Sequence, residues 1–376
     1  MIYFDNAGTT KCSQKAIEIV KKYLEDVYFN PSAMYHDAIQ AKNDLNSARA
    51  DILKTLHASD GKLVFTSGGT ESDNLACFGK KFPSNSRIIV SNAEHSAIYQ
   101  CALELKQRGY DVVFAPVDIA GRVIIEEFEK LLTPNTSFVS IIHVNNETGA
   151  INDIKKLCEL AKKANSRLLF HSDGVQAYGK IPTNVISLGV DMYSISAHKI
   201  GAPKGVGALY IKKGLMLAPI ILGGGQEGGL RSSTENVGGI IALAEQGKTY
   251  NNNLSENRQK ISLIRNEIKD YLANFPEIII LESQDNTHNI LTFSSNTVRG
   301  EVMQHALERR GILIGTGSAC SSNKASRRIA EALNLKGKYV DGIMRLSFSP
   351  ENTLEDAREF ITTFDEIYKD LKQYGS

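Results

Sequence analysis

The sequence has no excess of charge of either sign, no apolar run long enough to cross a membrane and no closely paired cysteines. Its 376 residues contain 43 Lys and Arg against 42 Asp and Glu, a net charge of +1. Such a balance gives no long-range field that would select nucleic acid or an anionic membrane. The first residues show no basic segment followed by an apolar core. We therefore expect a cytoplasmic protein with no direct nucleic-acid or membrane partner.

The five cysteines are odd in number and lack the spacing of a zinc site or a disulfide framework. This pattern favours a reducing compartment and predicts no metal site. The hydrophobic content of 42% is ample for a buried core, and the length is typical of two domains.

Short apolar runs alternate with amphipathic helical patterns over residues 62–211. This alternation predicts a mainly parallel sheet with helices on both faces. A charged helical region, residues 236–274, has a break in its middle and leads to shorter strands and helices of α+β type. We predict a large α/β domain over residues 15–250 and a smaller α+β domain over residues 1–14 and 251–376. The strands expected in the large domain are Leu63–Thr66, Arg87–Val90, Val112–Ala115, Phe138–Val144, Leu168–His171, Met192–Ser196 and Val206–Ile211.

Lys199 stands where one predicted strand gives way to a glycine-rich turn. Met192–Ser196 alternates apolar and small residues as a strand does, and Gly201–Gly205 then breaks any regular element. An amine at a strand end can be partly desolvated and set near other cations. Its pKa then falls, and it can form a Schiff base with a carbonyl compound. The alternative is a solvated surface lysine, which most lysines of this chain must be.

Three further motifs lie at predicted strand ends. Ser67–Ser72 opens a helix, so its backbone N–H groups and hydroxyls can bind a phosphate, or can merely cap the helix. His95 opens the next helix, where it can stack on a flat ring or serve as a hydrogen-bonding residue at the helix start. Asn145–Gly149 places an amide where it can bond a ring hydroxyl, although Asn-rich turns are common.

Asp173 also ends a predicted strand, and a buried carboxylate there must be paired. A pyridinium nitrogen is one such partner. A carboxylate that keeps this nitrogen protonated lets pyridoxal phosphate act as an electron sink, and a lysine carries that cofactor as a Schiff base. We therefore interpret Asp173 and Lys199 as two parts of one site.

Two loops of small residues lie further along the chain. Gly223–Thr234 is rich in glycine and hydroxyl groups, so it can approach a phosphate closely, or can be a flexible connector. Gly315–Asn323 places Cys320 among small residues, whereas the cysteines in helical patterns are expected to pack as small hydrophobes. A thiol that must reach a substrate belongs in such a loop, although a lone exposed cysteine is usually inert.

In their order and number, these motifs resemble those of the cysteine desulfurases of the NifS and IscS type. That family consists of pyridoxal phosphate enzymes of fold type I within aminotransferase class V. The resemblance implies an α/β fold of the PLP-dependent transferase type, with a large α/β domain around a mainly parallel sheet and a smaller α+β domain that carries the cysteine loop. It rests on Phe4–Thr10, Asn30–Ser32, Thr66–Ser72, Glu94–His95, Val144–Glu147, Asp173–Gln176, Ser196–Lys199, Gly223–Glu227, Arg231–Thr234 and Gly317–Cys320.

The resemblance implies how the ring of pyridoxal 5'-phosphate is held. Lys199 would carry the cofactor as a Schiff base, Asp173 would bond the pyridine nitrogen, and His95 would stack on the ring. Asn146 and Gln176 would meet the region of the ring hydroxyl.

The resemblance also implies the groups that bind the phosphate and the substrate. Arg345, helped by Asn30, would bind the substrate carboxylate. Thr234 would reach the phosphate from the partner subunit, so a homodimer is expected. The residues implied to hold the phosphate within one chain are Gly69, Thr70, Ser196 and His198.

The implied reaction converts L-cysteine to L-alanine, with Lys199, Cys320 and His95 as the catalytic residues. Lys199 as a free amine would remove the α-proton, and the Cys320 thiolate would take the substrate sulfur as a persulfide. An acceptor protein would then collect this sulfur for iron–sulfur cluster, thio-cofactor or tRNA biosynthesis. Gly228, Ser233 and Ser349–Asn352 depart from the family pattern.

Two alternatives to the desulfurase remain at this point. One is another class V enzyme, such as a selenocysteine lyase or an aminotransferase, in which Cys320 is incidental. The other is a non-catalytic scaffold that binds pyridoxal phosphate. The scaffold predicts that the lysine, the carboxylate or the cysteine is damaged, and all three are present.

Overall fold

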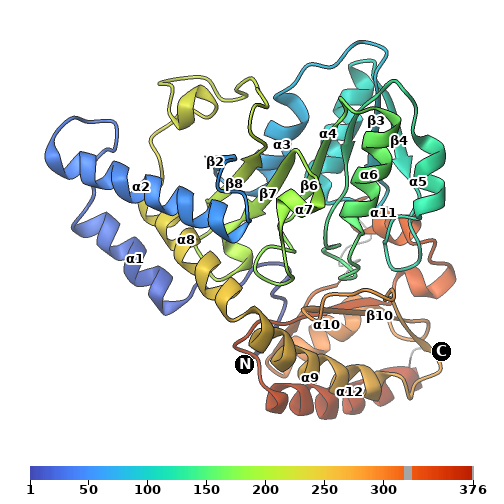
Figure 1. Cartoon of the computed structure of the whole chain (residues 1–376). Coiled ribbons are helices and arrows are strands. Elements are labelled where there is room, and N and C mark those ends of the chain that lie inside the picture. Colours follow the sequence, from blue (N-terminus) through green and yellow to red (C-terminus); the bar gives the residue numbers. More distant parts are fainter. Residues whose placement is uncertain (317–323, 375–376) are drawn as a thin grey trace.

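Seven strands form the large sheet of the computed structural model, which describes residues 1–316 and 324–374 (Figure 1). Their order across the sheet is β2-β8-β7-β6-β5-β3-β4. The strands from β7 to β4 pair in parallel, whereas β8 is antiparallel to both of its neighbours. The strands are β2 (Lys62–Thr66), β3 (Arg87–Ser91), β4 (Asp111–Ala115), β5 (Thr136–Ser140), β6 (Leu169–Asp173), β7 (Met192–Ser196) and β8 (Gly207–Ile211).

The prediction of a mainly parallel sheet is confirmed, with β8 as the exception. β7 and β8 are joined by the short segment 197–206. A parallel return needs a crossover of about a dozen residues or more, so this connection must reverse the chain.

One predicted strand is shorter than expected. Phe138–Val144 was predicted, but β5 ends at Ser140. At Ile142 the backbone N–H donates to the Glu94 carboxylate, and the backbone carbonyl accepts from the Asn152 side chain. Because side chains occupy both groups, the pairing with β3 stops there.

Helices cover both faces of the large sheet, and α1 and α2 form an arm that packs against α8 (Figure 1). Side chains close several helix N-termini: Ser13 accepts from a backbone N–H of α1, and Asp153 does so for α6. The helices are α1 (Gln14–Glu25), α2 (His36–Thr55), α3 (Gly69–Phe78), α4 (Ser96–Gln107), α5 (Ile125–Leu131), α6 (Ile154–Ala164), α7 (Val185–Leu188) and α8 (Val237–Asn252), with a 3-10 turn η1 at Ala197–Lys199 and another, η2, at Glu227–Gly229.

The remaining elements form a smaller unit around two small sheets. An antiparallel sheet has the order β12-β10-β9, and β1 pairs in parallel with β11. The N-terminal strand therefore belongs with the C-terminal part of the chain. The elements are β1 (Ile2–Phe4), α9 (Leu254–Leu272), β9 (Ile278–Ile280), β10 (Ile290–Ser295), α10 (Gly300–Arg309), β11 (Ile312–Ile314), α11 (Lys324–Ala332), the 3-10 turn η3 (Gly337–Val340), β12 (Ile343–Ser347) and α12 (Leu354–Tyr374).

The two units have separate hydrophobic cores. Phe4 from β1 packs edge-on against Phe348 and Phe360 in the core of the smaller unit. The predicted break in the long helical region is confirmed, since α8 ends at Asn252 and α9 begins at Leu254. The residue boundaries of the two domains stay a prediction.

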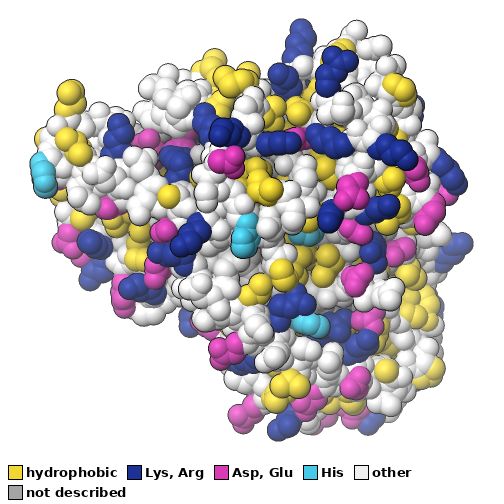
Figure 2. Space-filling view, in the orientation of Figure 1, with side chains coloured by type: hydrophobic (Ala, Val, Ile, Leu, Met, Phe, Trp, Pro, Cys, Tyr) yellow, Lys and Arg dark blue, Asp and Glu magenta, His cyan; other side chains and the backbone are white. Residues whose placement is uncertain are grey.

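The surface carries basic and acidic side chains interspersed on the face shown in Figure 2. This agrees with the net charge of +1. Among the described helices, none is both long enough and apolar enough to span a membrane.

Candidate active site

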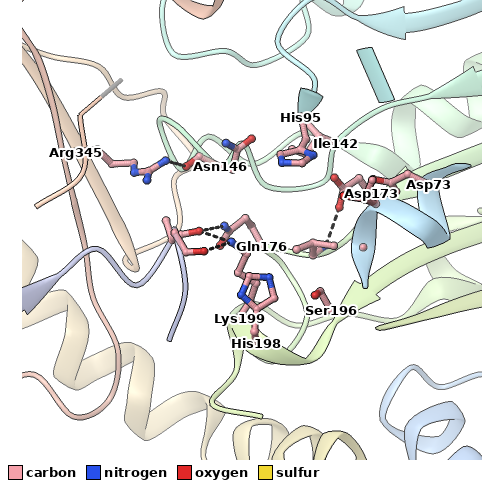
Figure 3. Close-up of a pocket in the computed structure, with 15 residues that line it drawn as sticks. Asp73, His95, Ile142, Asn146, Asp173, Gln176, Ser196, His198, Lys199 and Arg345 are labelled. Atoms are coloured by element: carbon pink, nitrogen blue, oxygen red, sulfur yellow. Dashed lines mark hydrogen bonds between the residues drawn. The ribbon is translucent and has the colours of Figure 1, made fainter. Parts of the chain in front are cut away.

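A cavity of about 330 Å³ lies at the carboxyl ends of the parallel strands (Figure 3). Open sheets of this type bind their ligands in this position. Most of the predicted site residues line it: Gly69, Thr70, His95, Asn146, Asp173, Gln176, Ser196, His198, Lys199 and Arg345.

The sheet order explains why residues distant in sequence meet here. Asp173 ends β6, and Lys199, Asn146 and His95 follow β7, β5 and β3 respectively; these four strands are consecutive neighbours in the sheet. Because the strands are parallel, their carboxyl ends lie at one edge. The chain segments that follow them therefore converge on one space.

Lys199 lies in η1, directly after β7, and its amine points at the N-terminal segment of the chain. Nζ donates to the backbone carbonyls of Ala7 at 2.6 Å and Gly8 at 2.7 Å. Burial, and next the positive charge of Arg345, lowers the pKa of Lys199 to about 8. An amine with this pKa is partly neutral near pH 7, so it can bond to an aldehyde or accept a proton.

Asp173 is the last residue of β6, and its carboxylate is buried. One of its oxygens accepts from the backbone N–H of Val175 at 2.9 Å. Burial raises the pKa of Asp173, while the nearby His95 and Lys199 counteract this effect. The carboxylate is thus placed to pair with a cationic group in the cavity.

Asp73 is a cavity residue that the sequence reasoning missed. One side-chain ligand atom each from Asp73, His95 and Asp173 lies within 4.8 Å of the other two. Among the described residues, neither carboxyl oxygen of the buried Asp73 has a hydrogen-bond partner, although Nε2 of His171 lies 3.7 Å from one of them. Burial, together with the charge of Asp173, raises the pKa of Asp73 well above the usual range. Its position four residues after Gly69 on α3, hence on the same helix face, was the available signal.

His95 faces Lys199 across the cavity (Figure 3). It is the N-cap of α4, and its Nδ1 accepts from the backbone N–H of Ala97 at 3.2 Å. Because Nδ1 is the acceptor, we assign the ring proton to Nε2. Both interpretations of this residue are thus compatible: it caps the helix and presents its ring to the cavity.

The N-terminus of α3 opens onto the cavity, with Gly69 and Thr70 in its lining. Its N-cap, Gly68, makes no side-chain cap, so N–H groups of the first turn remain free for a ligand. A Cβ on Gly69 would lie 2.7 Å from Cγ2 of Val175. A Cβ at position 69 would therefore force the Val175 side chain to shift.

Arg345 lies on β12 at the opposite end of the cavity from Asp173 (Figure 3). Its guanidinium donates to Asp5 at 3.0 Å, to the Glu147 carboxylate at 3.1 Å and to the backbone carbonyl of Asn146 at 2.9 Å. Its Nε is buried and has no partner among residues 1–316 and 324–374. Asp5 and Glu147, which the sequence reasoning did not single out, thus fix the arginine at this end of the cavity.

The cavity residues fit pyridoxal phosphate. A helix N-terminus with free N–H groups suits the phosphate, and the buried Asp173 carboxylate suits a ring nitrogen that carries a proton. In the part of the chain that the structure describes, the buried side-chain oxygen of Asn146 has no partner, so it can accept from a ring hydroxyl. Lys199 is the amine that can bond to the aldehyde.

Two predicted residues do not line this cavity within one chain. Asn30 and Thr234 both line a smaller hollow of about 210 Å³, beside α1 and the start of α8. The side chain of Asn30 there accepts from the backbone N–H of Ser32. Cys320, the third predicted catalytic residue, lies outside the described residues.

Comparisons with known proteins point to one family. The aminotransferase class-V family model matches residues 2–360. A NifS/IcsS protein homolog from Lactobacillus delbrueckii subsp. bulgaricus is 40% identical over 377 residues, covering 98% of this chain and 97% of that protein. Cysteine desulfurase IscS from Dictyoglomus turgidum is 35% identical over 381 residues, covering 99% and 95%.

Comparison with solved structures points to the same family. One described as a NifS-like protein is 34% identical, with a TM-score of 0.91, and the match covers 98% of this chain and 99% of that chain. Another, described as SspA in complex with cysteine, is 29% identical with a TM-score of 0.80, covering 93% and 99%.

The fold and the cavity define an α/β enzyme built to hold pyridoxal phosphate at the ends of its parallel strands. The chain belongs to the aminotransferase class-V family, whose members use this cofactor. The resemblance, the fold class and the cofactor predicted from the sequence are confirmed. Relatives at 35–40% identity are named as a NifS/IcsS protein homolog, as cysteine desulfurase IscS or simply as cysteine desulfurase.

Proposed function

We propose that this protein is a cysteine desulfurase, which converts L-cysteine to L-alanine and carries the sulfur on Cys320 as a persulfide. The observation that supports this best is the convergence of a low-pKa lysine, a buried carboxylate and an arginine on one cavity. These are the groups needed to hold pyridoxal phosphate and an amino-acid carboxylate together. The names of the relatives point to cysteine as the amino acid.

The site residues would divide the work by position. Arg345 binds the substrate carboxylate with its guanidinium, at the end of the cavity away from Asp173 (Figure 3). As a free amine, Lys199 would accept the α-proton at Nζ, because its lowered pKa leaves a neutral fraction. His95 and Asn146 would orient the cofactor ring from the side of the cavity opposite Lys199 (Figure 3). When bound, pyridoxal phosphate supplies the electron sink for the charge that develops at the α-carbon.

The sulfur step requires a second nucleophile, which we assign to Cys320. Its thiolate attacks the substrate sulfur, so an S–S bond forms while the bond between Cβ and sulfur breaks. The electron pair of the broken bond stays with Cβ, which then takes a proton to become the methyl group of L-alanine. The persulfide on Cys320 passes to an acceptor protein that supplies iron–sulfur cluster, thio-cofactor or tRNA biosynthesis.

We also propose a homodimer in which Thr234 reaches the phosphate of the partner subunit and Asn30 assists at the substrate end. The location of both residues outside the cavity of their own chain supports this arrangement. Exposed apolar side chains at the α1–α2 arm, including Tyr28, Met34 and Tyr35, offer surface for the partner. The cytoplasmic location and the domain boundaries inferred from the sequence remain part of this proposal.

The test is release of alanine and sulfide from L-cysteine with a reductant, with the cofactor absorbance followed in parallel. The wild-type protein should release both products. Cys320→Ala should release neither, yet L-cysteine should still change its cofactor absorbance, because the earlier steps use Lys199. Cys12→Ala is the matched control, since Cys12 is the one described cysteine that is not buried, and it should keep full activity.

Two outcomes would contradict the proposal. Full activity of Cys320→Ala would make this thiol incidental. A wild-type protein that binds the cofactor but turns over only another amino acid would favour a selenocysteine lyase or an aminotransferase.

A further inference from the structure

Lys180 is a buried lysine that none of the assigned roles uses. Its exposed fraction is 6%, and it lies in the turns that follow β6. In the described part of the chain, its Nζ has one hydrogen-bond acceptor, Oε1 of Gln176 at 2.8 Å. Burial, then the positive charges of Lys199 and Arg345, lowers the pKa of Lys180 to about 7. A buried ammonium usually has a carboxylate partner, so a neutral amide as partner requires an explanation.

Gln176 connects Lys180 to the reactive lysine. While Oε1 of Gln176 accepts from Lys180, its Nε2 donates to the backbone carbonyl of Ala7 at 2.9 Å. The same carbonyl accepts from Nζ of Lys199 at 2.6 Å. Gln176 is itself buried and lines the cavity beside Lys199 (Figure 3). Both ends of its amide are therefore fixed by polar neighbours.

The chemistry of Lys180 determines which end of the amide faces the cavity. A glutamine amide can rotate by half a turn, exchanging its oxygen for its NH₂ group with little change in shape. A protonated lysine has donors and no acceptor, so the amide end that faces the Lys180 ammonium must be the oxygen. The NH₂ group then points the other way, with one hydrogen on the Ala7 carbonyl and the second left for a ligand.

We propose that Lys180 is a positioning residue, which holds the Gln176 amide so that an N–H group meets the ring oxygen of the cofactor. This inference rests on the proposed function, because it concerns the contact assigned there to Gln176. Without Lys180, the amide oxygen would be buried with no donor, which is unfavourable. Rotation of the Gln176 amide would give this oxygen another partner. The amide would then lose its bond to the Ala7 carbonyl and would no longer offer an N–H group to the cofactor.

The test is a double-mutant cycle on cofactor binding, with Lys180→Met, Gln176→Leu and the double variant. The affinity for pyridoxal phosphate and the pH titration of the bound cofactor's absorbance are measured for each. Each single variant should bind the cofactor about tenfold more weakly, the size expected for one buried hydrogen bond. The double variant should be weaker than either by less than about twofold, because both changes remove the same contact. Both single variants should shift the midpoint of the titration in the same direction.

Further variants separate positioning from folding. Methionine removes a buried cation without a carboxylate partner, so Lys180→Met is expected to fold. Lys180→Arg keeps the donors and should stay within about threefold of the wild-type affinity. Lys162→Met is the matched control. Lys162 is a partly buried lysine of the same unit, bonded to Asp191, and its loss should leave the affinity unchanged.

The inference is overturned if the two single effects multiply in the double variant, if Lys180→Met alone changes neither affinity nor titration, or if Lys180→Arg loses as much affinity as Lys180→Met. None of these measurements requires turnover. If the variants show the coupling but the wild-type protein makes no alanine, the proposed function alone is refuted. If the wild-type protein makes alanine but the variants show no coupling, this inference alone is refuted.

Discussion

Lys199 should react with pyridoxal phosphate at a much lower pH than an ordinary lysine. Only the neutral amine attacks an aldehyde, and burial with the charge of Arg345 lowers the pKa of Lys199 from 10.5 to about 8. At a pH below both the ordinary and the lowered pKa, each unit by which the pKa falls raises the neutral fraction of the amine tenfold. At pH 7 about a tenth of the Lys199 amines are then neutral, which is roughly 300 times the fraction of an unperturbed lysine.

The assay mixes cofactor-free protein with pyridoxal phosphate and follows the absorbance of the bound form. The rate should rise about tenfold per pH unit up to about pH 7 and level off above about pH 8, because a depressed lysine pKa makes the amine fully neutral there. In Arg345→Met one cause of the depression is gone, so the plateau should begin at higher pH. Arg358→Met, which removes an exposed arginine paired with Glu267, is the control and should not move it.

A rate that keeps rising tenfold per unit to about pH 10 would refute this reasoning, because it would show that the amine has the pKa of a solvated lysine. An unchanged profile in Arg345→Met would refute the electrostatic part alone, and would leave burial as the whole cause.

Two further predictions concern packing and charge. Gly69→Ala should weaken cofactor binding at least about tenfold, since its Cβ would lie 2.7 Å from a side-chain carbon of the cavity wall. Gly68→Ala, whose Cβ would have nothing within 4 Å, should not weaken cofactor binding. Equal losses of affinity in the two variants would contradict the steric argument. Arg49→Met should lower the unfolding free energy by about 3–5 kcal/mol, because it leaves the buried Glu227 carboxylate without its bidentate partner. Lys130→Met, in an exposed pair, should change the same thermal or denaturant unfolding by less than about 1 kcal/mol, and a similar small loss for Arg49→Met would contradict the prediction.

The sequence allows the strand ends of the large sheet to be predicted because each is marked locally. Apolar runs of strand length end in glycine, asparagine or acidic residues, and parallel strands bring such ends to one edge. Gly69, His95, Asp173 and Lys199 are found at the cavity for this reason. β8 shows that local patterns do not predict the direction of a strand, since β8 runs antiparallel to β7 because the connection between them is short.

Other parts of the site depend on contacts that no local pattern reports. Arg345 meets Asp5, which is 340 residues away in the chain, only because the residue after β1 and the end of β12 meet at a bridge between Asp5 and Ser347. The amide of Gln176 gains its orientation from Lys180 one helical turn further on, in a segment that has no regular pattern. Such pairings follow from packing in three dimensions, and the sequence alone does not reveal them.

The pairing of β1 with β11 has a consequence for the order of synthesis. Residues 2–4 leave the ribosome long before their partners at 312–314 are made. Until then, the segment with the carbonyls of Ala7 and Gly8 is held beside Lys199 by the large unit alone, through bonds such as those from the Thr10 N–H to the His198 carbonyl and from the Gln176 amide to the Ala7 carbonyl. A nascent chain can therefore complete the large sheet and these contacts, whereas the strand pairing of residues 2–4 forms only near the end of translation.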